Sequence, residues 1–272
     1  MRVEFTKMHG LGNDFIVLDL RKRAVHNLAA IIRRLSDRRF GVGFDQALIL
    51  KASKKADFRM DIYNPDGTRV EMCGNGIRCI ARYVWDRGLS RKAALDIETL
   101  AGVIRPEKKG GLIRVDMREP VLEAGLIPAR AKGTVINRPL RAGGKTFNIT
   151  CVSMGNPHCV IFVDDVLRFP VVKFGPEIEA NSFFPKKANV EFVQVLDRKT
   201  LKMRVWERGA GETLACGTGA SASVVAAHLN NLSDRKAKVL LAGGALSIEW
   251  AEDNHVYMTG PAEEVFTGSA NI

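Results

Sequence analysis

The sequence predicts an α/β (α+β) protein of two pseudo-symmetric domains, each a mixed, barrel-like β-sheet around a central helix. Three observations carry this prediction: a Cys-Gly-x-Gly phrase occurs twice, polar residues recur at one constant offset, and strand-like segments alternate with a few helices in both halves. With 272 residues, each half can bury a core. We expect the halves at residues 1–118 and 119–272, with room for the extreme C-terminus to pack back on the first.

The repeat has an offset of 143 residues, which separates Cys73 of Cys-Gly-Asn-Gly from Cys216 of Cys-Gly-Thr-Gly. At the same offset, the strand-like FRMDIYN at 58–64 aligns with LKMRVWE at 201–207. Three further polar pairs keep it: Asn13 with Asn156, Gln46 with Asn189, and Asn64 with Glu207. The same offset at four pairs of polar residues indicates that one half of the chain is a duplicate of the other.

In the first half, a helix is expected after Asn27, the predicted N-cap, because apolar residues recur at helical spacing from Leu28 to Leu35. A second helix begins beside Cys73 and ends at Gly88, so its N-terminus lies next to the thiol. Asn-Pro-Asp-Gly at 64–67 predicts a turn. Strands are expected at 3–7, 15–19, 47–50, 58–63, 94–98 and 112–116.

The second half begins with a Pro-, Gly- and Arg-rich stretch at 119–145, which we interpret as a crossover. The segment around Ala180-Asn181-Ser182 is expected in a helix. A further helix over 219–229 is rich in Ala, Ser and Val nearly all round, so it is expected to be buried centrally. Strands are expected at 146–152, 158–163, 190–195 and 202–206.

Composition narrows the class of protein. No run approaches the roughly 18 apolar residues of a membrane span, and the N-terminus lacks the apolar core of a secretory signal, so we expect no membrane partner and a cytoplasmic location. The five cysteines are odd in number, which argues against a disulfide framework.

The net charge of +11 raises the possibility of nucleic-acid binding. However, the 41 Lys and Arg residues are scattered and no nucleic-acid motif surrounds them, so we expect no nucleic-acid partner. A metal site is also not expected, because the sequence has no Cys-x-x-Cys spacing and its five histidines are dispersed.

The two repeated thiols carry the chemical prediction. A cysteine at a glycine-rich turn before a helix lies among unpaired backbone N–H groups and the positive end of the helix dipole, which favour the thiolate. Inverting a carbon centre requires a proton to leave one face and another to arrive on the opposite face. Two equivalent acid–base groups can do this, and a thiol with a pKa of about 8.5 needs only a modest shift to work near neutrality.

Three long motifs resemble the diaminopimelate epimerase family: HGLGNDF at 9–15, NPDGTRVEMCGNGIRC at 64–79 and ERGAGETLACGTGA at 207–220. MGNPHCV at 154–160 and ANVEFV at 188–193 extend the resemblance over essentially the whole chain. One departure follows GPEIE at 175–179, where the family usually has His-Pro and this chain has Ala180-Asn181. The resemblance implies a cofactor-independent isomerase that interconverts LL- and meso-diaminopimelate for lysine and peptidoglycan precursors, commonly as a homodimer.

Carried over by position, the resemblance makes Cys73 and Cys216 the catalytic acid–base groups and implies that His158 and Glu207 tune them. Arg208 is a natural bidentate partner for the distal carboxylate of the substrate. The substrate-binding positions are Asn13, Gln46, Asn64, Gly74, Asn75, Asn156, Asn189, Glu207, Arg208, Gly217 and Thr218.

Proline or hydroxyproline racemase is the alternative, since that family shares the two-thiol design and a Cys-Gly-Thr-Gly phrase. It typically has His after the first Cys-Gly, whereas this chain has Asn75. A thiol–disulfide redox protein would place its paired cysteines close in sequence. A Cys–His hydrolase would leave one repeated thiol idle. Cys79, Cys151 and Cys159 lack the motif and are interpreted as buried structural thiols.

Overall fold

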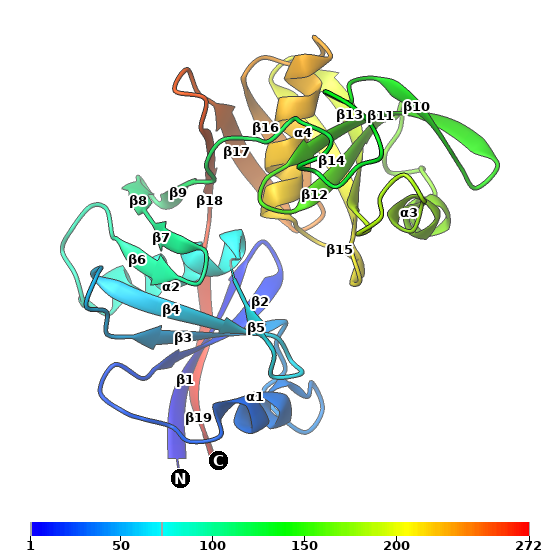
Figure 1. Ribbon diagram of the computed structural model, residues 1–272. Helices are drawn as coiled ribbons and strands as arrows, with labels where there is room; N and C mark the ends of the chain where they lie inside the picture. Colours follow the sequence, from blue (N-terminus) through cyan, green and yellow to red (C-terminus); the bar gives the residue numbers. More distant parts are fainter. Residues whose placement is uncertain (1, 72, 272) are drawn as a thin grey trace. The chain divides into compact units, whose positions relative to one another are not determined.

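The computed structural model describes residues 2–71 and 73–271 and divides into two compact units. Unit 1 comprises Met1–Val115 and Thr259–Ile272, and unit 2 comprises Asp116–Met258 (Figure 1). Both units combine a mixed β-sheet with two helices, as the α+β prediction required. The division of the duplicated halves at 118/119 stays a prediction. No helix in the described part of the chain is long and apolar enough to cross a membrane.

The sheet of unit 1 has the pairing order β19-β1-β2-β3-β4-β6-β7, with β5 paired to β4 (Figure 1). It is mixed, because β2–β3 and β4–β6 are parallel and the other described pairs are antiparallel. Its strands are β1 (Arg2–Gly10), β2 (Asn13–Asp19), β3 (Gln46–Lys51), β4 (Phe58–Tyr63), β5 (Arg69–Val70), β6 (Ile97–Thr99), β7 (Gly102–Ile104) and β19 (Glu263–Asn271). Strands β8 (Pro106–Lys109) and β9 (Leu112–Asp116) form a hairpin.

Two helices pack in unit 1, α1 (Leu28–Ser36) and α2 (Gly74–Asp86). Helix α2 contacts β1, β2 and β3, and its residues from Gly74 to Ala81 are all buried, which places its N-terminus in the interior of the unit. Helix α1 contributes Ile32 and Leu35 to an apolar cluster of unit 1. Asn27 stands at the predicted N-cap but makes no side-chain cap bond, because its backbone is left-handed with φ 54°.

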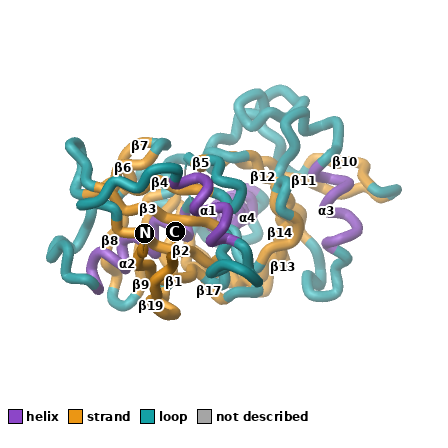
Figure 2. Tube along the Cα trace, turned by 90° about the horizontal axis from the view of Figure 1, so that it is seen from below, coloured by secondary structure: helices purple, strands orange, loops and turns teal. Residues whose placement is uncertain are grey.

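Unit 2 repeats this plan. The part of the second sheet that lies in unit 2 has the pairing order β10-β11-β12-β13-β14-β16-β17-β18, with β15 paired to β14. The pairs β12–β13 and β14–β16 are parallel. Strands β10 to β14 are among the strands drawn in orange in Figure 2. The strands are β10 (Arg138–Ala142), β11 (Lys145–Ser153), β12 (Pro157–Phe162), β13 (Asn189–Asp197), β14 (Thr200–Glu207), β15 (Gly211–Thr213), β16 (Lys236–Leu241), β17 (Gly244–Trp250) and β18 (Val256–Gly260). The helices are α3 (Val171–Glu179) and α4 (Gly217–Leu229).

Helix α4 is the buried central helix that the sequence predicted. It contacts β11, β12, β13, β14, β16 and β17, and all its residues from Gly219 to Ala227 are buried. The small side chains allow strands to approach the helix on several sides. Ser221 and Ser223 are accommodated because each hydroxyl donates to a helix carbonyl oxygen one turn earlier.

Strand pairing confirms the 143-residue repeat. Phe15 pairs with Gln46 on parallel β2–β3, and His158 pairs with Asn189 on parallel β12–β13. Ala47 opposite Tyr63 recurs as Val190 opposite Trp206. Helices α1 and α3 span equivalent positions, as do α2 and α4. Residues 143 apart therefore occupy equivalent places in the two sheets.

Several expectations differ from the structure. The sheets are not closed barrels, because neither pairing order joins its last strand to its first within residues 2–71 and 73–271. Ala180 caps the C-terminus of α3, so Asn181 and Ser182 lie beyond the helix, where Oδ1 of Asn181 accepts from the N–H of Phe183. The crossover at 119–145 contains β10. Strands β16 to β19 were not predicted.

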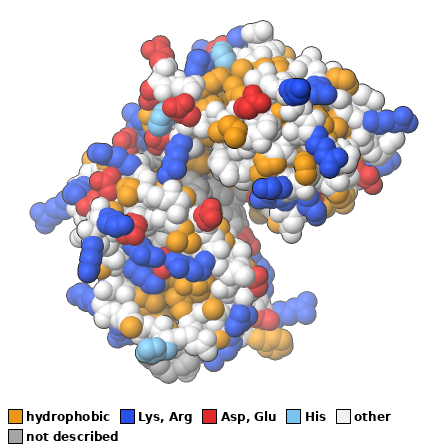
Figure 3. All heavy atoms as spheres, in the orientation of Figure 1, with side chains coloured by type: hydrophobic (Ala, Val, Ile, Leu, Met, Phe, Trp, Pro, Cys, Tyr) orange, Lys and Arg blue, Asp and Glu red, His pale blue; other side chains and the backbone are white. Residues whose placement is uncertain are grey.

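Lys and Arg side chains are spread over the face seen in Figure 3, between acidic and uncharged ones. The expectation of scattered basic residues holds for this face.

Candidate active site

In unit 1, the thiol of Cys73 lies at the N-cap of α2. The backbone of Cys73 is extended, with φ −141° and ψ 112°, and the helix begins at Gly74. The N–H of Gly76 donates to Sγ of Cys73 at 3.3 Å. A Cβ at position 76 would lie 2.9 Å from Cδ2 of Leu48, so this turn requires glycine. The first turn of a helix presents N–H groups suited to a thiolate or a carboxylate.

Two asparagines lie beside this thiol. Oδ1 of Asn13 is 4.0 Å from Sγ of Cys73 and accepts from Nδ2 of Asn75 at 3.1 Å. Arg78 is fully buried and donates to Oδ1 of Asn75 at 3.0 Å and to the carbonyl oxygen of Gly74 at 3.2 Å. Burial lowers the pKa of the Arg78 guanidinium. The buried cation thereby fixes the helix turn that carries Asn75.

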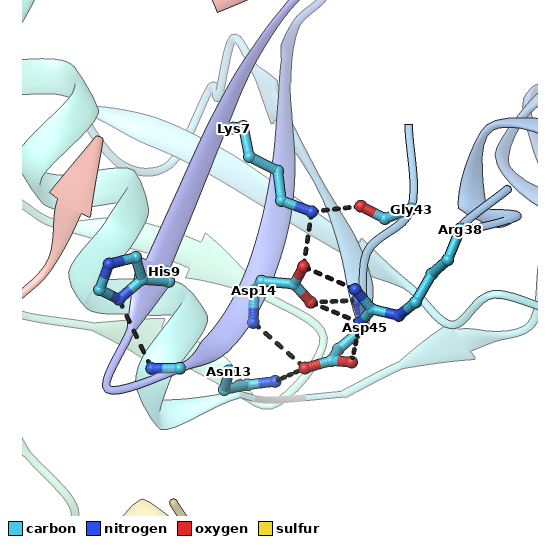
Figure 4. Close-up of polar contacts among 8 residues, drawn as sticks. Lys7, His9, Asn13, Asp14, Arg38, Gly43 and Asp45 are labelled. Carbon is cyan, nitrogen blue, oxygen red and sulfur yellow. Dashed lines mark hydrogen bonds and ion pairs between the residues drawn. The ribbon is translucent and has the colours of Figure 1, made fainter. Parts of the chain in front are cut away.

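A charged cluster holds Asn13 from the other side (Figure 4). Nδ2 of Asn13 donates to Oδ2 of Asp45 at 2.9 Å. Arg38 joins Asp45 to Asp14, with Nη2 at 2.7 and 2.8 Å from the two carboxylates, and Nζ of Lys7 is 2.5 Å from Asp14. Burial alone would raise the pKa of Asp14, but the hydrogen bonds from Arg38 and Lys7 outweigh it and lower this pKa to about 2. Asn13 is thus held by Asp45, and Arg38 links Asp45 to Asp14.

Gln46 and Asn64 form a polar pair on the neighbouring strands β3 and β4. Nε2 of Gln46 donates to Oδ1 of Asn64 at 3.1 Å, and Nδ2 of Asn64 donates to Oγ1 of Thr68 at 3.1 Å. The predicted turn forms here, since the N–H of Gly67 donates to the carbonyl oxygen of Asn64 at 2.9 Å. Both amides are half-buried.

In unit 2, the thiol of Cys216 occupies the equivalent N-cap, that of α4. The backbone is again extended, with φ −128° and ψ 110°, and the helix begins at Gly217. Sγ lies 3.5 Å from Oγ1 of Thr218. A Cβ at Gly219 would lie 2.7 Å from Oε1 of Glu191 and 3.3 Å from the thiol. In both Cys-Gly-x-Gly motifs, a Cβ on the last glycine would therefore lie close to the cysteine and to a side chain from a strand.

The electrostatic surroundings of Cys216 differ from the expectation. Burial raises the pKa of this thiol well above its usual value, and the negative charges of Glu207 and Glu191 raise it further. The hydrogen bond with Thr218 acts in the opposite direction but is outweighed. Burial also raises the pKa of Glu207, which accepts from Oγ1 of Thr213 at 2.5 Å. The pKa of Cys216 is therefore shifted in the direction opposite to that expected for a thiolate, because burial outweighs the hydrogen bonds from Thr218 and from the backbone N–H of Gly219.

His158 is fully buried between two polar partners. Nδ1 is 2.7 Å from Oε1 of Glu191, and Nε2 is 2.9 Å from Oδ1 of Asn156. Nδ2 of Asn156 in turn donates to Oγ1 of Thr218 at 3.3 Å. A continuous row of polar contacts thus runs from Glu191 to the side chain next to Cys216.

The side chain of Asn189 holds the backbone at Arg208, whose own side chain is exposed. Its Nδ2 donates to the carbonyl oxygen of Pro157, and its Oδ1 accepts from the backbone N–H of Arg208, both at 2.9 Å. The guanidinium of Arg208 makes a hydrogen bond of 3.2 Å with the carbonyl oxygen of Lys186 and is exposed to solvent. It can therefore reach a ligand carboxylate at little cost in broken contacts.

The structure thus places the predicted residues of each half in one unit and brings several of them into contact, as in the contacts of Asn13 with Cys73 and Asn75. Glu191 and Arg78, together with Asp14 and Asp45, were missed. The available signal was a charged residue within an apolar segment: Glu191 in NVEFV and Arg78 in GIRCIA. Unit 1 contains the predicted residues Cys73, Gly74, Asn75, Asn13, Gln46 and Asn64. Unit 2 contains the predicted residues Cys216, Gly217, Thr218, Asn156, His158, Asn189, Glu207 and Arg208.

Cys79, Cys151 and Cys159 are fully buried, and burial raises the pKa of the Cys79 and Cys159 thiols. Within the described ranges, no group of three or more His, Cys, Asp and Glu side chains is arranged to hold a metal ion.

A sequence profile described as diaminopimelate epimerase matches residues 5–123 and 150–265 of the chain. The diaminopimelate epimerase of Moorella thermoacetica is 53% identical, over 98% of this chain and 98% of its own length. That of Acetivibrio thermocellus is 50% identical, over 99% of each chain.

Solved structures with the same fold are more distant in sequence. A phenazine biosynthesis protein of the PhzF family from Bacillus anthracis superposes with a TM-score of 0.74 at 17% identity and covers 100% of both chains. A hydroxyproline epimerase from Agrobacterium vitis superposes with a TM-score of 0.68 at 11% identity, over 99% of this chain and 91% of that one. At these identities the likeness shows the fold alone.

Proposed function

The chain belongs to the diaminopimelate epimerase family, and from this membership we propose that it interconverts LL- and meso-2,6-diaminopimelate for lysine and peptidoglycan precursor biosynthesis. The observation that carries the proposal is the repeated N-cap thiol: two equivalent helices, α2 and α4, each begin directly after a cysteine. An inversion at carbon needs two such groups.

In the proposed reaction, one thiolate removes the α-proton of the substrate and the other thiol delivers a proton to the opposite face of the resulting carbanion. One C–H bond breaks and one forms, and the thiol and thiolate states are exchanged. The raised pKa of Cys216 supports its thiol form at rest, the form that can donate a proton. No cofactor is needed for this sequence.

The carbanion places negative charge on the adjacent carboxylate. We propose that N–H groups at Gly74-Asn75 and Gly217-Thr218 receive this charge, since the first turns of α2 and α4 present such donors. Losing one donor of this kind typically raises the barrier by about 2.7–4 kcal/mol.

The remaining predicted residues suit the distal half of a diamino diacid. The guanidinium of Arg208 is assigned to the distal carboxylate, and Asn64, Asn189 and Gln46 supply amides for the distal amino acid group. Asn13 and Asn156 lie beside the thiols, and His158 and Glu207 set their ionisation. A small ring substrate, as in the proline racemase alternative, would leave Arg208 and these amides without a function.

The test is exchange of the α-hydrogen of diaminopimelate for deuterium in heavy water, followed together with epimerisation. Cys73→Ala and Cys216→Ala should each abolish epimerisation, because neither thiol can serve both faces. Cys151→Ala, a thiol buried in β11, serves as the matched control and should retain turnover. Near-normal epimerisation by either motif variant, or exchange with proline but not with diaminopimelate, would contradict the proposal.

We also propose a cytoplasmic location and a homodimer. Light scattering of the purified protein measures the second, and a monomeric mass at all working concentrations would exclude it.

A further inference from the structure

Glu191 is a buried carboxylate whose presence in β13 requires an explanation. It is fully buried between the apolar residues Val190 and Phe192. One oxygen, Oε1, contacts His158, whereas Oε2 has no hydrogen-bond partner among the described residues. Burying a carboxylate with an unsatisfied oxygen is unfavourable for folding. The residue is therefore expected to serve something other than stability.

The repeat shows that the fold itself does not need this charge. At the equivalent positions, 143 residues earlier, unit 1 has Leu48 in place of Glu191 and Phe15 in place of His158. The registers of the strand pairs are the same, and Leu48 approaches Gly76 just as Glu191 approaches Gly219. An apolar pair thus fills in unit 1 the place that a hydrogen-bonded His–Glu pair fills in unit 2.

The contacts of Glu191 and His158 determine the orientation of the Asn156 amide. Both ring nitrogens of His158 face acceptor oxygens, Oε1 of Glu191 and Oδ1 of Asn156. Only the imidazolium form can donate to both, and an adjacent carboxylate stabilises that form. With Oδ1 held by the ring, the amide of Asn156 directs its Nδ2 donor to Thr218.

The charged groups around Cys216 come from three strands: His158 from β12, Glu191 from β13 and Glu207 from β14. Glu207 acts on the thiol from its own strand. Glu191 also lies against the first turn of α4, where Gly219 leaves room for it. It therefore touches both the helix that carries Cys216 and the ring that orients Asn156.

We propose that Glu191 is a positioning residue of the reaction: it keeps His158 protonated on both nitrogens and so fixes the amide of Asn156 with its N–H donors toward the substrate carboxylate. This inference rests on the proposed epimerase function, because the fixed donor has a role only if a carboxylate binds beside Cys216. Without Glu191, a neutral His158 ring accepts at Nε2, and the Asn156 amide turns its oxygen toward Thr218.

The test replaces Glu191 by its neutral isostere, Glu191→Gln, and observes His158 directly by NMR of protein labelled with ¹⁵N-histidine. The wild type should show both nitrogens of His158 protonated at neutral pH, and Glu191→Gln should show a neutral ring protonated on Nδ1. In epimerisation, KM should rise roughly ten- to hundredfold, the size expected for misaligning a hydrogen bond to a charged group. Glu191→Asp, which retains the charge, should restore the doubly protonated signal.

The matched control is a second His–carboxylate pair in the same unit, Nδ1 of His255 at 2.9 Å from Asp116. Asp116→Asn should alter the His255 signal and leave KM unchanged. A neutral His158 in the wild type, or an unchanged His158 signal in Glu191→Gln, would overturn the inference. Failure of the proposed function is seen separately, as wild-type protein that does not epimerise diaminopimelate.

A second variant covers the case in which Glu191→Gln fails to fold. Glu191→Leu combined with His158→Phe installs the apolar pair that unit 1 already packs at these positions. This double variant should fold, and its KM should rise as in Glu191→Gln. A folded double variant with wild-type KM would refute the positioning role.

Discussion

Replacing Asp14 with asparagine should destabilise unit 1 by about 2 kcal/mol at neutral pH. The Asp14 carboxylate binds Lys7 and Arg38 and is only 16% exposed (Figure 4). Its pKa in the folded protein is about 2, against an ordinary value of 3.8. A difference of about 1.8, at about 1.36 kcal/mol for each pKa unit, corresponds to about 2 kcal/mol of stability from the ionised group.

The sign of the pH dependence follows from the lowered pKa. The stabilisation is fully present above the unfolded value near 3.8 and is lost as the pH falls through about 2. The free energy of unfolding of the wild type should therefore exceed that of Asp14→Asn by the full difference of about 2 kcal/mol at pH 7 and by roughly half of that difference at pH 3.

The assay is urea unfolding of protein labelled with 5-fluorotryptophan, because the ¹⁹F resonance of Trp85 reports on unit 1, while Trp206 and Trp250 report on unit 2. Asp234→Asn, which removes an exposed pair with Arg198 at 2.9 Å, is the control and should change stability by less than about 1 kcal/mol. A difference below about 0.5 kcal/mol at pH 7, or one that stays constant down to pH 3, would refute the argument from charge.

Further predictions concern the thiols, the glycine turns and the arginine. Cys73→Ser and Cys216→Ser should fold but epimerise poorly, since a hydroxyl is a far weaker acid than a thiol; steady-state kinetics with circular dichroism tests this. Dialysis against chelator should leave activity unchanged, whereas restoration by added metal or pyridoxal phosphate would contradict cofactor independence. Gly219→Ala should lower the melting temperature and kcat/KM more than Gly76→Ala, because the new Cβ meets a carboxylate held by a hydrogen bond at 2.7 Å in the first case and a methyl group at 2.9 Å in the second; equal effects would count against this. Arg208→Lys should raise KM with little change in kcat, because lysine cannot bind a carboxylate bidentately; a fall in kcat alone would argue against distal binding.

The sequence alone determined the features that depend on local pattern and on the repeat. Period-two spacing is typical of strands such as β4 and helical spacing predicted helices such as α1, because these periods follow from backbone geometry. The constant offset of 143 predicted two equivalent units and two equivalent thiols, since a duplicated sequence repeats its hydrophobic pattern and strand register.

Tertiary structure decided what depends on neighbours distant in sequence. The raised pKa of Cys216, opposite in direction to the expected thiolate, arises because only the folded chain removes water from that thiol and surrounds it with Glu207 and Glu191. The hydrogen bond between His158 and Glu191 joins residues 33 positions apart on neighbouring strands, and no local pattern encodes it. Asn27 has the right residue type for an N-cap yet takes a left-handed conformation, since the chain entering α1 sets its backbone angles. Local patterns thus determined which elements form, and packing determined the ionisation and orientation of the side chains between them.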